Sequence, residues 1–77
     1  MKLTITSTER VVTINEVPAR IWEGTTETGV PVTCFITRVA VPESVSDVEH
    51  DRFRAELEEH APPSAEANWW PARMVLD

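Results

Sequence analysis

The chain has 77 residues, a formal net charge of −6 and a single cysteine, Cys34. This length accommodates one domain, residues 1–77, with a thin core, and one cysteine excludes an internal disulfide. The acidic balance argues against direct binding to nucleic acid or to anionic membranes, and no apolar run approaches the roughly 18 residues of a membrane span.

The first segment predicts a β-hairpin. Over residues 3–14, threonines alternate with apolar side chains, which is typical of a strand with one buried face. The polar residues 7–9 interrupt this alternation, so the pattern fits either one long strand or two short ones. Asn15 and Glu16 come next and are a turn candidate.

Two more strands are predicted before the first helix. Pro18 restricts the next strand to an edge or to its first residue, so residues 19–23 are expected to be its paired part. Residues 24–29 begin and end with glycine and predict a hairpin loop. Residues 30–41 are apolar on both faces, as expected of a central strand that is covered on at least one side.

A helix is predicted after the sheet. Ser46 and Glu49 have the spacing of a capping box, and Pro62-Pro63 would stop a helix that runs from about Asp47 to His60. Its apolar positions form a narrow stripe that can cover one face of a sheet. A final strand is predicted at residues 70–76.

The predicted fold is therefore α+β. We expect an antiparallel sheet of three to five strands packed against one acidic helix, in the order βββαβ or ββββαβ.

No residue pattern predicts catalysis, a metal site or a cofactor. Cys34 lies among apolar strand residues, where a thiol tends to stay protonated. His50 and His60 are ten residues apart, roughly 15 Å along a helix, so they cannot share one task. Glu56 with His60, and Asp47 with Asp51, share helix faces, but two ligands are fewer than zinc requires. We therefore expect a non-enzymatic binding protein.

The negative charge is concentrated in one region. Residues 43–60 hold seven acids against two arginines, a net charge of −5, whereas residues 1–42 are balanced. On the predicted helix, the acids fall into two neighbouring rows, one of Asp47, Asp51 and Glu58 and the other of Glu49, Glu56 and Glu59. These rows fit either a surface that imitates the phosphates of nucleic acid or a solvated helix face that keeps the protein soluble.

Two adjacent tryptophans are a second candidate for an interface. Neighbouring residues on a strand point to opposite faces, so Trp69 and Trp70 cannot readily enter one thin core. Tryptophan is a frequent interface anchor, although both side chains could instead cover the edges of the core. An exposed tryptophan and a thin core also fit a homodimer.

The stretch STERVVTINEVPARIWEGTTETGVPVTCFITRVAV, residues 7–41, resembles small proteins encoded by phages and prophages, some of which are anti-CRISPR proteins. The resemblance implies a stoichiometric inhibitor in the cytoplasm of the host bacterium. Its partner would be a host protein complex with a basic surface that binds nucleic acid. The alternative is a self-associating structural or accessory phage subunit. The residues expected to bind the partner are Asp47, Asp51, Glu56, Glu58, Glu59, Trp69 and Trp70.

Overall fold

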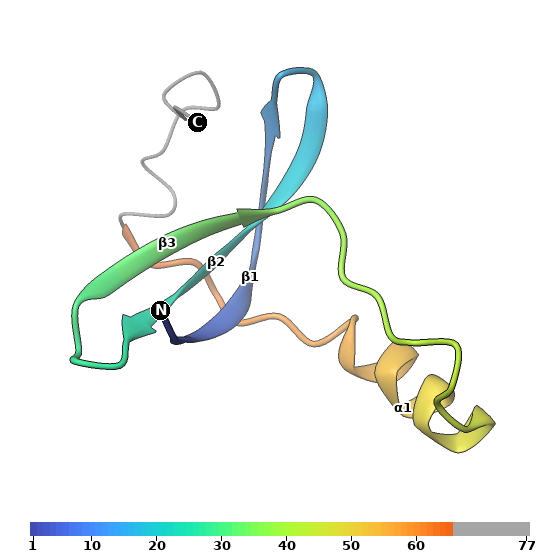
Figure 1. The fold of residues 1–77 in the computed structure, drawn as a ribbon. Helices are drawn as coiled ribbons and strands as arrows, with labels where there is room; N and C mark the ends of the chain where they lie inside the picture. Colours follow the sequence, from blue (N-terminus) through green and yellow to red (C-terminus); the bar gives the residue numbers. More distant parts are fainter. Residues whose placement is uncertain (66–77) are drawn as a thin grey trace.

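The computed structural model describes residues 1–65, which fold into a three-stranded antiparallel sheet followed by one helix (Figure 1). The elements are β1 (Leu3–Ile14), β2 (Val17–Thr26), β3 (Pro31–Ile36) and α1 (Asp47–Glu56), and the sheet order is β1-β2-β3. This arrangement confirms the α+β class and the order of three strands and a helix. The strand predicted at residues 70–76 lies outside the described residues.

A two-residue turn joins β1 to β2, as the sequence predicts. Asn15 and Glu16 both have positive φ angles, 49° and 67°, and Ile14 pairs with Val17 on either side of them. Positive φ at both central residues matches the right-handed twist of the flanking strands. Asparagine adopts this conformation readily, whereas glutamate does so less often.

Strand β1 is one long strand with a bulge. Its regular pairing with β2 ends at Ser7 and resumes at Val11, and in this interval β2 contributes Ile21 alone. The extra residues of β1 bend the strand and increase its local twist. Of the two possibilities that the sequence leaves open, the single strand is therefore the one observed, and the polar residues 7–9 mark its bulge.

Thr8 holds the bulge together. Its hydroxyl donates to the carbonyl oxygen of Ile21 at 2.7 Å and accepts from the backbone N–H of Arg10 at 3.2 Å. The Arg20 guanidinium donates to the Thr8 carbonyl oxygen at 2.9 Å. Because only 2% of Thr8 is exposed, these groups would otherwise be polar atoms without partners in the interior.

The connection between β2 and β3 is shorter than predicted. Strand β2 continues through Gly24 to Thr26. The prediction of a loop over residues 24–29 is therefore wrong for residues 24–26, which belong to the strand. A Cβ atom at Gly24 would overlap the Thr4 carbonyl oxygen of the neighbouring strand. Glycine is therefore required at this position by the close approach of the two strands. Gly29, with φ of 90°, does form the turn, and its N–H donates to the Thr26 carbonyl at 3.0 Å.

Strand β3 ends earlier than predicted and is not the central strand. It covers Pro31–Ile36 instead of residues 30–41, and β2 lies between β1 and β3. The last pair between β2 and β3 is Arg20 with Ile36, after which the β1–β2 hairpin continues alone (Figure 1). Residues 37–40 are exposed, so their apolar members do not pack as strand residues.

The core is small and lies on one face of the sheet. Its buried apolar residues are Val12, Ala19 and Ile21, of which Ile21 is fully buried. The half-buried Ile14 and Phe35 pack against this cluster. The strand register places all five side chains on the same face, as the two-residue period of a strand requires.

Helix α1 begins where the sequence predicts. The Ser46 hydroxyl accepts from the Glu49 N–H at 3.1 Å, and a Glu49 carboxylate oxygen accepts from the Ser46 N–H at 3.2 Å. These two bonds complete the capping box. The prediction of its end at His60 is wrong, because α1 ends at Glu56 and Leu57 is its C-terminal cap.

Helix α1 buries none of its residues. Most of the helix lies to one side of the sheet (Figure 1). It therefore adds no fully buried side chain to the core, unlike the helix that the sequence predicts to cover one face. Within residues 1–65, no helix combines the length and the apolar character that crossing a membrane requires.

Residues 57–65, the closing segment, return to the sheet and pair with β1. Ala61 forms a parallel bridge with Thr8. The Ala61 N–H donates to the Ser7 carbonyl at 2.9 Å, and the Glu9 N–H donates to the Ala61 carbonyl at 3.0 Å. Between the helix and this bridge, the Glu58 and Glu59 N–H groups donate to the carbonyls three residues before them, Ala55 and Glu56, so the helix ends in tighter turns before the chain reaches β1.

We predict that Thr8→Val destabilises the protein by about 1–3 kcal/mol. Valine keeps the shape of the threonine side chain, but it leaves the Ile21 carbonyl oxygen and the Arg10 N–H without their hydrogen bonds to the Thr8 hydroxyl. Urea unfolding measures this change. Thr13→Val is the matched control, since Thr13 is exposed on the same strand. Equal stability of the two variants would contradict the role of Thr8.

Candidate binding surface

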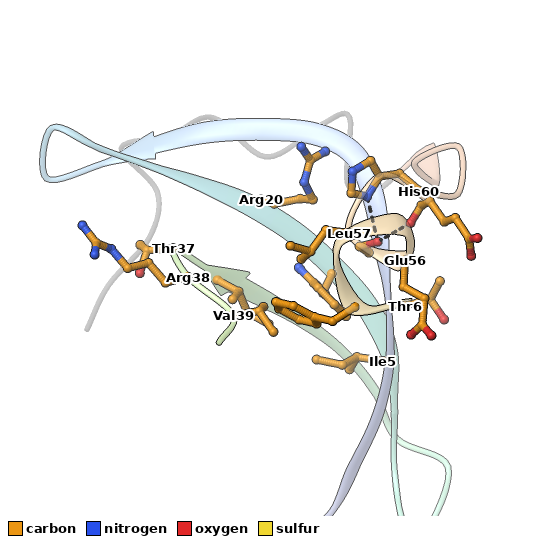
Figure 2. A pocket seen from close by; sticks show the side chains of 14 residues that line it. Ile5, Thr6, Arg20, Thr37, Arg38, Val39, Glu56, Leu57 and His60 are labelled. Atoms are coloured by element: carbon orange, nitrogen blue, oxygen red, sulfur yellow. Dashed lines mark hydrogen bonds between the residues drawn. The ribbon is translucent and has the colours of Figure 1, made fainter. Parts of the chain in front are cut away.

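A cleft of about 680 Å³ lies between the sheet and the C-terminal end of α1 (Figure 2). Its apolar lining residues come from β1, from β2, from the end of β3 and the connection after it, and from the C-terminal part of α1. They are Ile5, Trp22, Ile36, Val39, Phe53 and Leu57. The cleft therefore lies on the sheet face opposite the core that contains Val12 and Ile21.

Charged side chains surround this apolar lining. Arg20 and Arg38 contribute from the sheet side, and Glu56 and Glu59 contribute from the helix side. In Figure 2, the Arg38 side chain lies at the opposite end of the cleft from Glu56 and His60. Arg20 lies nearer to His60, because its guanidinium bonds to the carbonyl of Thr8, which is the neighbour of Ser7. The cleft thus has an apolar lining with charged groups of both signs around it.

Ser7 fastens the closing segment to β1 at one end of the cleft. Its hydroxyl donates to the Glu59 carbonyl at 3.0 Å and lies 2.8 Å from Nδ1 of His60 (Figure 2). A hydroxyl has one proton, so with Glu59 as its acceptor, Ser7 accepts from a protonated Nδ1. We refer to these contacts of Ser7, Glu59 and His60 as the serine clasp.

The Ser7 side chain is largely enclosed. Only 7% of Ser7 is exposed, and its hydroxyl bonds to the Glu59 carbonyl oxygen. These contacts hold the closing segment against β1.

A second contact continues the attachment across the sheet. The backbone N–H of Ser64 donates to one carboxylate oxygen of Glu23 at 3.0 Å, and the Ser64 hydroxyl bonds to the other. Glu23 belongs to β2, whereas Ala61 pairs with β1. The closing segment therefore runs from β1 to β2 within a few residues.

Sequence reasoning missed the serine clasp. Ser7 and His60 are 53 positions apart, and neither lies in a recognisable local motif. The sequence predicts His60 on the helix and on one face with Glu56, but His60 lies beyond the helix end and contacts Ser7.

The acids predicted to bind a partner are exposed. Asp47, Asp51 and Glu56 lie on α1, whereas Glu58 and Glu59 lie after its end. The predicted rows are therefore wrong beyond Glu56, because the last acids do not follow the helical repeat. The predicted Trp69 and Trp70 lie outside the described residues.

All seven acids of residues 43–59, here named the acidic segment, are exposed. In the described part of the chain, one ion pair occurs, between Lys2 and Glu27 at 3.9 Å, and it lies outside this segment. The carboxylates of the acidic segment thus face solvent without a cationic partner among residues 1–65. They are Glu43, Asp47, Glu49, Asp51, Glu56, Glu58 and Glu59.

The residues with metal-binding side chains are dispersed. Among residues 1–65, no three His, Cys, Asp or Glu side chains are grouped closely enough to hold an ion. Cys34 is half-buried in β3 and pairs with Trp22, on the sheet face opposite the core. His50 lies on α1, and His60 belongs to the serine clasp.

Comparison with protein-family models, with curated proteins and with solved structures finds no match.

We predict that Ser7→Ala loosens the closing segment without unfolding the sheet. Loss of the serine clasp should raise the hydrogen-exchange rate of the Ala61 and Glu9 amides roughly 5–30-fold, since a lost buried hydrogen bond is worth about 1–2 kcal/mol. The exchange rates of the amides that join β2 to β3 should change little. Ser44→Ala, at an exposed position, is the control. An unchanged exchange rate at Ala61 in the Ser7 variant would show that the clasp holds nothing.

Proposed function

We propose that this chain is a non-enzymatic binding protein whose acidic segment binds a basic surface on a protein partner. The observation that carries the proposal is the exposure of all seven carboxylates on a segment that contributes no fully buried side chain to the core. Exposed carboxylates attract a complementary basic surface over about a Debye length.

Local structure supports a recognition role for this segment. The capping box fixes the start of α1, and the serine clasp fixes the chain after its end. The carboxylates between these two points are therefore presented on a defined backbone, which lowers the entropic cost of binding.

A partner that normally binds nucleic acid is the class that fits best. Such proteins present rows of lysine and arginine that neutralise phosphates, and exposed carboxylates can occupy the same positions. The net charge of −6 also opposes direct binding of the chain to nucleic acid. The resemblance of residues 7–41 to small phage proteins is consistent with an inhibitor of a host complex in bacteria.

Neutralising part of the acidic segment should abolish capture of the partner. We predict that the triple variant Asp51→Asn, Glu56→Gln and Glu58→Gln fails to retain a basic protein from a bacterial lysate that the unmodified protein retains. The three changes preserve side-chain shape and spare the capping box. Mass spectrometry of the retained proteins is the measurement.

The matched control neutralises three exposed acids outside the acidic segment, one in β1 and two in the turns of the sheet, which changes the net charge by the same amount. They are Glu9→Gln, Glu16→Gln and Glu27→Gln. This variant should retain the partner. Raising the salt from about 0.1 M to about 1 M should release it, because the Debye length falls from about 10 Å to about 3 Å. Equal retention by both triple variants would contradict the proposal.

A further inference from the structure

The cleft beside the acidic segment exposes apolar surface on both of its walls. Leu57, at the end of α1, is 39% exposed, and Val39, in the connection after β3, is 43% exposed. Phe53 and Trp22 also line the cleft and are half-buried. An open apolar recess surrounded by charged groups is the usual form of a pocket that receives an anchor side chain at a protein interface.

The charges at the cleft specify what kind of segment could lie there. Glu56 and Glu59 line its helix side and belong to the acidic segment, so the carboxylate surface is continuous with the cleft. Arg20 and Arg38 line the other side, and the Arg20 guanidinium is already held by the Thr8 carbonyl. Because both arginines belong to the lining itself, a basic group is disfavoured inside the cleft and favoured beside it, over the exposed carboxylates of the acidic segment.

We infer that the cleft receives an apolar side chain of a basic segment of the partner protein, while lysine or arginine residues beside that side chain lie over the acidic segment. This inference rests on the proposed function and names the chemistry of the partner. A second copy of the chain is a poor occupant, because two molecules of net charge −6 repel each other.

Peptide titrations followed by ¹⁵N NMR test the inference. The first peptide has one central phenylalanine flanked by lysines, the second has alanine at the centre, and the third has phenylalanine flanked by glutamates. The phenylalanine–lysine peptide should shift the amides of both the cleft and the acidic segment. The alanine–lysine peptide should shift those of the acidic segment alone and bind roughly tenfold more weakly, because an apolar side chain is no longer buried. The glutamate peptide should shift neither.

Two variant pairs locate the binding site of the phenylalanine. Leu57→Asn and Val39→Asn place a polar group in the cleft, and both should reduce the affinity for the phenylalanine–lysine peptide to that for the alanine–lysine peptide. Leu3→Asn and Val30→Asn are the controls, because they are similarly exposed, at 40% and 56%, and lie outside the cleft. The controls should bind as the unmodified protein does.

The outcomes separate this inference from the proposed function. If both lysine peptides shift the acidic segment with equal affinity, the cleft receives no anchor and the inference fails alone. If neither lysine peptide shifts the acidic segment, the proposed function fails as well. Shifts that appear on raising the protein concentration without peptide would indicate a second copy in the cleft and would also overturn the inference.

Discussion

The attachment of residue 61 to the bulged part of β1 is the constraint on which the rest of the structure depends. Strand β1 lies at the edge of the sheet, and at its bulge the Ser7 carbonyl and the Glu9 N–H both bond to Ala61. Within the bulge, the Thr8 hydroxyl bonds to the Ile21 carbonyl oxygen and to the Arg10 N–H. A defect in one hairpin thereby becomes the site where the second half of the chain is held.

This attachment determines the form of the binding surface. Helix α1 ends at Glu56, shortly before the bridge at Ala61, and Leu57 and Phe53 line the cleft beside the sheet. The preceding turns of the helix lie away from the core, so their carboxylates stay exposed. The cleft and the acidic segment are thus two consequences of one tertiary contact.

Features with a local cause were predictable from the sequence. The turn at Asn15 depends on the residues of the turn itself, and the start of α1 depends on Ser46 and Glu49. Gly24 misled the prediction because glycine serves tight turns and close strand packing alike, and only the partner strand shows which role applies. The sequence identified the exposed acids as candidates for binding. It predicted a wrong arrangement for Glu58 and Glu59, because the helix ends before them.

The serine clasp and the cleft could not be predicted in this way, since each combines residues from both ends of the described chain. Through-hydrogen-bond scalar couplings measured by NMR test their common basis most directly. The account predicts couplings from the Ala61 amide nitrogen to the Ser7 carbonyl carbon and from the Glu9 amide nitrogen to the Ala61 carbonyl carbon. Absence of both, in a sample that shows couplings between β1 and β2, would contradict it.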